Sequence, residues 1–178
     1  MKNIALVGKM ASGKSYYASL LRQELIDHGI NPSIIHISSK IKGLAVELFL
    51  MEDKARDLLQ KIAGKMREID EDVWLKYLIS NVKKEGQLPF ILDDVRFKKE
   101  VDMLRDNFDL LVVKIESDDA NRRSVYRSKY GRYPTVKESN DVTETSSDDI
   151  IPDMVLNNDY TEISAKRNIS RILEALQI

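Results

Sequence analysis

The amino-acid sequence predicts an α/β fold in which a parallel sheet of five strands has helices on both faces. Two observations predict this class. Short apolar segments alternate along the chain with longer segments of helical character, which is typical of strand–helix–strand units. The segments are mostly apolar and do not alternate between apolar and polar residues, as is usual for strands covered on both sides. The length of 178 residues fits a single domain.

Each predicted strand is a short apolar run. In chain order the runs cover residues 4–7, 33–37, 89–92, 110–115 and 154–156. The first run ends at Gly8, and the third ends in the pair Asp93–Asp94. No run approaches the length of about 20 apolar residues that a membrane span requires, so we expect no membrane partner.

The predicted helices lie between and after these strands. They cover residues 13–28, 97–107, 118–130 and 162–176, and two or three more fall between residues 39 and 85. Gly29 can cap the end of the first helix. In the 39–85 region Gly64 and Asp70 are the expected joints. Glycine inside a helix costs about 1 kcal/mol relative to alanine, so we expect a joint or a close approach at Gly64.

The composition excludes several classes of function. The chain has no cysteine, which excludes disulfides, thiolate nucleophiles and cysteine-based metal sites. Its two histidines are too few for a multi-histidine zinc site. A net charge of −1 argues against a dedicated nucleic-acid-binding protein. Residues 4–7 are too short for a signal-peptide core, so we expect a cytoplasmic protein.

One motif carries a specific chemistry. The sequence Gly8-Lys9-Met10-Ala11-Ser12-Gly13-Lys14-Ser15 matches the phosphate-loop pattern G-x-x-x-x-G-K-[ST] in full. The glycines allow the backbone to approach a phosphate closely, and the N–H groups of the loop converge on its oxygens. Lys14 is the expected charge for the β- and γ-phosphates of ATP, and Ser15 is the expected hydroxyl ligand of Mg²⁺. We include the next residue, Tyr16, among the expected nucleotide-binding residues.

The context of this motif favours a kinase. It follows an apolar strand and opens a helix, whereas a glycine-rich turn with an incidental lysine would need no such context. The chain has no Asn/Thr-Lys-x-Asp motif, which a GTPase would use to read guanine, and it is short for an oligomeric mechanical ATPase. A compact kinase is the class that remains.

Charged residues after the third strand are candidates for the metal and the acceptor. Asp93 and Asp94 fall at the edge where open α/β sheets bind ligands, and a carboxylate there can hold Mg²⁺ directly or through water. Arg96 can bridge donor and acceptor phosphates with its planar guanidinium group. The alternatives are that the aspartates cap the following helix and that Glu100 pairs with Arg96.

Basic residues are concentrated after the fourth strand. They are Arg122, Arg123, Arg127, Lys129 and Arg132, and the stretch after Lys137 carries five acidic residues and no positive charge up to Asp149. We expect residues 118–149 to form a mobile lid that closes over polyphosphate, because a phosphotransferase needs cations around the transferred group. A solvated surface with balanced charges is the alternative.

The order of these motifs resembles a known family. Ser39-Lys40-Ile41-Lys42, Leu59-Gln60-Lys61-Ile62-Ala63-Gly64 and Asp94-Val95-Arg96-Phe97-Lys98-Lys99-Glu100 follow the phosphate loop, with Arg67 and Trp74 between them. Over almost the whole chain this resembles the bacteriophage-type deoxynucleoside monophosphate kinases of the nucleoside monophosphate kinase superfamily.

The resemblance implies a single kinase domain over residues 1–178, with a helical acceptor-binding insert at about residues 39–85 and a lid at about residues 118–149. It implies acceptor contacts, with Arg67 on the acceptor's phosphate and Lys42, Gln60 and Trp74 lining its pocket. Trp74 is otherwise more typical of a core anchor. For catalysis it implies Lys14, Asp94, Arg96, Arg123 and Arg127.

The predicted activity is therefore ATP- and Mg²⁺-dependent phosphorylation of a small (deoxy)nucleoside monophosphate. Another small-molecule kinase, of the phosphomevalonate or dephospho-coenzyme A type, and a non-catalytic nucleotide-binding module are the alternatives. We expect no nucleic-acid polymer as a partner, and the sequence leaves a homodimer open.

Overall fold

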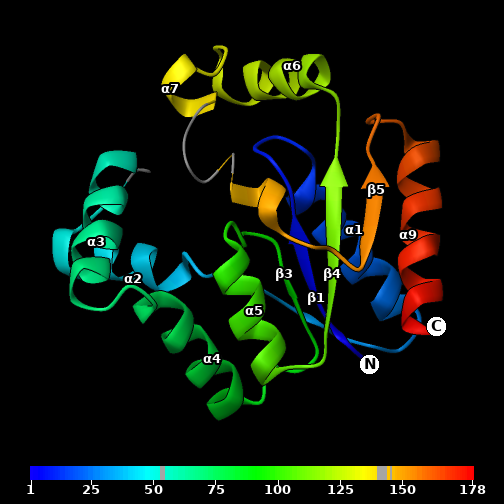
Figure 1. Ribbon diagram of the computed structural model, residues 1–178, viewed down its shortest axis with the longest axis horizontal. Coiled ribbons are helices and arrows are strands. Elements are labelled where there is room, and N and C mark those ends of the chain that lie inside the picture. Colours follow the sequence, from blue (N-terminus) through cyan, green and yellow to red (C-terminus); the bar gives the residue numbers. More distant parts are fainter. Residues whose placement is uncertain (53–54, 140–143, 145) are drawn as a thin grey trace. The chain divides into compact units, whose positions relative to one another are not determined.

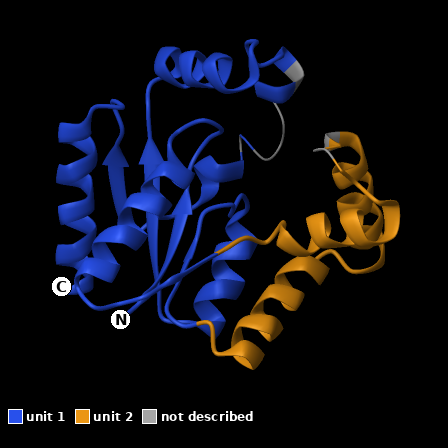
Figure 2. Cartoon of the chain, turned by 180° about the vertical axis from the view of Figure 1, so that it is seen from behind, with its two compact units in different colours: residues 1–34, 88–178 blue, residues 35–87 orange. Residues whose placement is uncertain are grey.

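The computed structural model describes residues 1–52, 55–139, 144 and 146–178. The chain forms two compact units, which Figure 2 shows in different colours. Unit 1 comprises residues 1–34 and 88–178, and unit 2 comprises residues 35–87. Unit 2 spans nearly the same residues as the predicted insert, whose role in acceptor binding stays a prediction. Residues 140–143 and 145 of the predicted lid lie outside the described residues.

A parallel sheet of five strands confirms the predicted fold class (Figure 1). In the order β2-β3-β1-β4-β5, the strands are Ser33–Ile35, Phe90–Leu92, Asn3–Val7, Leu110–Glu116 and Met154–Asn157. The central strand β1 pairs in parallel with β3 and with β4, so that Ile4 lies opposite both Ile91 and Leu111. All five residues of β1 are buried, as a strand covered on both faces must be.

Helices of unit 1 cover the sheet. The core on one face joins α1 (Lys14–Asp27) and α9 (Glu162–Leu176) to alternate strand residues such as Ile4, Leu6 and Val113. Successive strand residues point to opposite faces, so the equally buried Ala5 and Val112 lie on the other face. The helix α5 (Lys98–Asn107) contacts β4 and buries side chains of its own there.

The remaining elements of unit 1 follow β4. They are α6 (Asp119–Tyr130), α7 (Val136–Ser139) and the 3-10 helix η1 (Ser146–Asp149). The Asp118 carboxylate caps α6 by accepting the N–H of Asn121 at 2.8 Å. The sequence predicted α6 but neither short helix, because polar residues carry little periodic signal.

Unit 2 consists of three helices, α2 (Ser39–Phe49), α3 (Arg56–Ile69) and α4 (Val73–Glu85). Asp70 joins α3 to α4, as predicted. Its carboxylate accepts the N–H of Asp72 at 3.0 Å. Gly64 lies inside α3, and nothing lies within 4 Å of a Cβ built there, so our expectation of a joint or close approach was wrong. Trp74 is buried and its indole N–H donates to the Ala63 carbonyl at 3.2 Å.

Among the described residues, no helix is long and apolar enough to span a membrane. The second strand ends at Ile35, two residues before its predicted end at Ile37. The other four strands lie within one residue of their predicted bounds, and the closing helix has the predicted bounds of residues 162–176.

Candidate active site

The phosphate loop connects β1 to α1 and depends on two glycines. Gly8 and Gly13 have φ angles of +139° and +103°, a region that other residues rarely adopt. A Cβ at Gly8 would lie 2.4 Å from the Ile115 carbonyl oxygen, and one at Gly13 would lie 2.5 Å from the Asn158 side chain. Glycine is therefore required at both positions for two reasons. The φ angle is positive, and a neighbouring residue lies too close for a side chain.

Lys14 lies in the first turn of α1 and is almost fully buried. Its Nζ donates to the carbonyl oxygens of Gly8 at 2.6 Å and Lys9 at 2.9 Å. Burial, with a smaller contribution from the Arg96 cation, lowers the pKa of Lys14 to about 7, although nearby carboxylates oppose the shift. An anion bound at the loop would favour the charged form and raise this pKa again.

The loop is held from the side by the chain that follows β5. Asn158 is buried, and its Nδ2 donates to the Ser12 carbonyl at 2.9 Å while its Oδ1 accepts the N–H of Tyr160 at 3.0 Å. The Tyr160 hydroxyl donates to the Ala11 carbonyl. Side chains about 150 positions away in sequence therefore hold the carbonyls of Ala11 and Ser12 in the loop.

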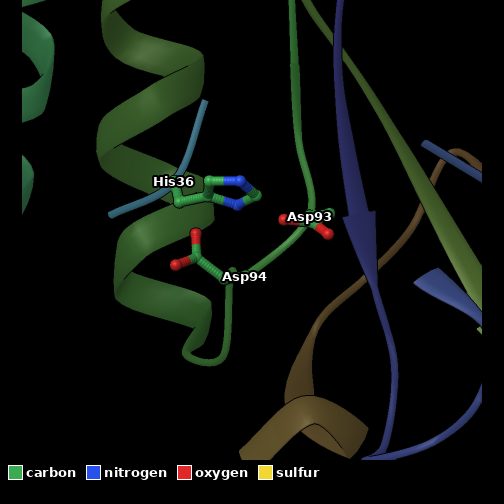
Figure 3. A group of neighbouring side chains, drawn as sticks. All are labelled: His36, Asp93 and Asp94. Carbon is green, nitrogen blue, oxygen red and sulfur yellow. The ribbon is translucent and has the colours of Figure 1, made fainter. Parts of the chain in front are cut away.

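Two observations test whether these residues fit a nucleotide with Mg²⁺. The buried Oγ of Ser12, inside the loop, has no hydrogen-bond partner among the described residues, so a phosphate oxygen can satisfy it. The hydroxyl of Ser15 is exposed, and the carboxylates of Asp93 and Asp94 follow β3 directly (Figure 3). Oxygen donors of this kind suit Mg²⁺, so the residues present fit the expected group.

The two aspartates differ in exposure. Asp93 is buried, whereas Asp94 is half-buried. Figure 3 also labels His36, which follows β2. The predicted metal ligands Ser15 and Asp94 stay predictions.

Arg96 makes a contact that the sequence did not indicate. Its guanidinium group donates to Oε1 of Glu144 at 3.0 Å, and Oε2 of Glu144 accepts the backbone N–H of Met10 in the phosphate loop at 2.5 Å. Glu144 is buried despite its charge. Glu100, whose pairing with Arg96 was the alternative, accepts the backbone N–H groups of Arg96 at 2.8 Å and of Phe97 at 3.1 Å and so caps α5.

The arginines of α6 divide into two groups. Arg122 reaches the phosphate loop, where it donates to the Met10 carbonyl at 3.3 Å. Arg123 and Arg127 lie against the ring of Tyr133, with centroid distances of 5.8 Å and 5.1 Å. The predicted catalytic pair therefore contacts an aromatic ring within the predicted lid, and Arg123 also lines a cavity beside the loop.

Two cavities adjoin the loop. One, of about 250 Å³, lies between the loop and α6 and is lined by Lys9, Met10, Arg122, Arg123, Tyr126 and Glu144 among others. The second, of about 450 Å³, is lined by Lys9, Ser12, Ser117, Asp118, Arg122 and Asn157 among others. The second lies at the carboxyl ends of β4 and β5, where open parallel sheets bind ligands.

The predicted acceptor residues belong to unit 2. Lys42 on α2 is exposed, as are Gln60 and Arg67, which lie seven positions apart and so on one face of α3. Trp74 is buried, and its indole hydrogen bond favours a packing role. The roles of all four stay predictions.

Comparison with known proteins addresses the fold. No family model matches the chain, and no curated protein sequence matches it. A sugar kinase from Janibacter sp. HTCC2649 is 14% identical with a TM-score of 0.63, over 100% of this chain and 95% of that chain. The APS kinase of Mycobacterium tuberculosis, solved with AMPPNP and APS, is 15% identical in sequence and has a TM-score of 0.58. The match covers 99% of this chain and 98% of that chain. A gluconokinase from Sinorhizobium meliloti 1021 is 11% identical in sequence and has a TM-score of 0.58. The match covers 99% of this chain and 95% of that chain.

The chain has the fold of the P-loop kinases. The sequence analysis assigned no site role to Glu144, Asn158 or Tyr160, although the family resemblance extends over Thr143-Glu144 and over Val155-Leu156-Asn157-Asn158. Glu144 falls in an acidic stretch where its charge alone is not distinctive. Asn158 offered a weak signal, since it lies two residues after a predicted strand, where side chains at the carboxyl edge of a parallel sheet gather.

Proposed function

We propose that the protein is an ATP- and Mg²⁺-dependent kinase that phosphorylates a (deoxy)nucleoside monophosphate to the diphosphate. The observation that carries this proposal is the convergence of cations on a complete phosphate loop. Lys14 lies within the loop, Arg122 contacts its backbone, and Arg96 is joined to it through Glu144. Binding of a nucleotide alone needs fewer cations than transfer of its γ-phosphate.

Each residue has a role in this proposal. The loop N–H groups and Lys14 bind the β- and γ-phosphates, and Arg96 neutralises charge between donor and acceptor. Arg123 and Arg127 add charge from the lid. Ser15 and Asp94 would hold Mg²⁺, which would supply positive charge to neutralise the phosphates of ATP. Catalysis then consists of positioning and charge neutralisation, and no covalent enzyme intermediate is required.

The acceptor assignment rests on unit 2. An exposed arginine can hold a phosphate in a bidentate way, and Arg67 presents such a group beside Gln60 on one face of α3. We propose that Arg67 binds the monophosphate and that Lys42 and Gln60 contribute to the same pocket. Trp74 supports this surface from the interior of unit 2.

An acceptor panel tests the proposal. ADP formation is measured with each common ribo- and deoxyribonucleoside monophosphate, and with phosphomevalonate and dephospho-coenzyme A, using Lys14→Ala as the inactive control. Turnover with a monophosphate that Lys14→Ala lacks is the expected result. Turnover only with one of the other two acceptors would replace the substrate class. Nucleotide binding without ADP formation from any acceptor would favour a non-catalytic binding module.

A further inference from the structure

A buried carboxylate is bound to the phosphate loop of the free protein. Glu144 accepts the N–H of Met10 at 2.5 Å through one oxygen and the guanidinium of Arg96 at 3.0 Å through the other. Only 6% of the residue is exposed. A carboxylate this deeply buried is stable only when charge and hydrogen bonds compensate its desolvation, and the loop supplies both.

The groups around Glu144 are those that a donor phosphate requires. They are a backbone N–H of the loop, a guanidinium group and, at longer range, the charge of Lys14. A backbone N–H has one hydrogen to donate, so the Met10 amide serves either the carboxylate or a phosphate oxygen. Two anions at one such position also repel each other strongly in a buried site.

We propose that Glu144 is an internal competitor of the donor phosphate. It occupies the anion position at the Met10 N–H in the free enzyme, holds Arg96 there, and leaves when a nucleoside triphosphate binds. The inference rests on the proposed function in that the ligand is a triphosphate. Glu144 thereby lowers the affinity for the donor. It also keeps Arg96 away from the phosphoryl group until the donor is bound.

The surrounding chain lets the side chain leave. The Glu144 carbonyl accepts the hydroxyl of buried Ser147 at 3.1 Å, a hydrogen bond that does not involve the carboxylate. In this proposal, rotation of the Glu144 side chain releases Met10 and Arg96 while that hydrogen bond stays in place.

Asp148 provides a matched control for charge. It lies four positions after Glu144, and its carboxylate contacts the side chains of loop residue Lys9 at 3.0 Å and of Lys114 at 3.4 Å. The Asp148 side chain is half exposed, so its ion pairs contribute little. Asp148→Asn therefore removes the same charge near the loop without freeing a loop N–H.

Isothermal titration of AMPPNP with Mg²⁺ tests the competition. Glu144→Gln, which keeps the shape and an oxygen acceptor but loses the charge, should bind AMPPNP about tenfold more tightly than the wild type, whereas Asp148→Asn should change the Kd by less than about threefold. A tenfold change corresponds to about 1.4 kcal/mol. If both variants lower the Kd for AMPPNP by the same factor, the loss of any negative charge near the loop is enough to explain the change. If Glu144→Gln raises the Kd, Glu144 supports nucleotide binding. Either result overturns the proposal.

Thermal unfolding gives an independent readout. Without ligand, Glu144→Gln should unfold at a lower temperature than the wild type, because Arg96 loses its buried partner. With saturating AMPPNP the two should unfold at nearly the same temperature, because Glu144 no longer makes the contact. An equal loss in both conditions would show that Glu144 stays in place, and the proposal would fail. These measurements use no acceptor, so a protein that binds AMPPNP but phosphorylates no monophosphate would refute the proposed function separately.

Discussion

Removal of the Asn158 side chain should destabilise the protein and weaken its phosphate loop. The amide joins the end of β5 to the loop through the Ser12 carbonyl at 2.9 Å and holds the N–H of Tyr160 at 3.0 Å. Only 1% of Asn158 is exposed, so water cannot readily replace these bonds. The variant Asn158→Ala leaves one acceptor and one donor without their partner.

The expected magnitude follows from these two groups. A buried polar group that loses its partner costs about 1–3 kcal/mol, so two should lower the free energy of unfolding by about 2–6 kcal/mol. At a urea dependence of about 2 kcal/mol per M, the unfolding midpoint falls by about 1–3 M. Most domains have about 5–15 kcal/mol of stability, so the variant should still fold. AMPPNP should bind about tenfold more weakly, because the loop is less preorganised.

Urea unfolding followed by circular dichroism measures the stability, and titration calorimetry measures the affinity. Asn107→Ala is the control, because Asn107 is an exposed amide on α5 that lines neither cavity beside the loop. A surface substitution of this kind should change stability by less than about 0.5 kcal/mol. If Asn158→Ala behaves like this control in both measurements, the asparagine does not support the loop and the reasoning is wrong.

Four further predictions concern the proposed reaction. Lys14→Ala should lower turnover by about 10²–10³ while the circular dichroism spectrum is unchanged, and turnover within threefold of the wild type would contradict the assignment. The pKa of Lys14 is about 7 without nucleotide, and a bound phosphate raises it. Above pH 7, nucleotide binding should therefore be accompanied by uptake of a proton. The affinity for nucleotide should then fall by up to about tenfold for each pH unit above 7. Titrations at pH 8 in buffers of different ionisation enthalpy would reveal that uptake, and identical heats would exclude it. Arg67→Ala should mainly raise the KM of the acceptor, whereas Arg96→Ala should mainly lower kcat. These roles would be refuted if steady-state kinetics gave both variants the wild-type kcat and the wild-type KM of the acceptor. Amide hydrogens of residues 131–139 should exchange quickly in the free protein and slowly with a bisubstrate analogue, and equal strong protection in both states would exclude a lid.

The sheet could be predicted because its strands carry their signal locally. Residues 4–7, 89–92 and 110–115 are apolar on both faces, and only a strand between two helical layers buries both. The second strand was harder, since Ile37 is as apolar as Ile35 but the strand ends before it. At Gly64 the sequence predicted a joint or a close approach, whereas the helix α3 continues through this residue. A helix in an otherwise favourable context tolerates the cost of one glycine, so the residue did not mark a joint.

The phosphate loop could be predicted for a similar reason, since its eight residues are contiguous. Glu144 and Asn158 could not, because their function is defined by partners far along the chain. Glu144 binds a loop residue 134 positions away, and Asn158 binds one 146 positions away. No local pattern distinguishes these side chains from other acids and amides on loops. Their importance arises only when the parallel sheet brings the ends of its strands to one edge.

The segment after β4 makes contacts that its charge pattern did not indicate. A run of arginines followed by acids predicts a soft, solvated segment, because such residues bury little apolar surface. In the structure, however, Tyr126 is buried and its hydroxyl donates to Glu138 at 3.1 Å, while Arg132 binds the same carboxylate and holds its pKa well below the ordinary value. Arg132 is therefore satisfied within the segment, whereas Arg122 reaches the Met10 carbonyl of the loop. Phosphate binding need not order α6 at all. It need only redirect the arginines that already face the loop, so we expect the change on binding to be concentrated in side chains and in the turn and short helix that follow α6.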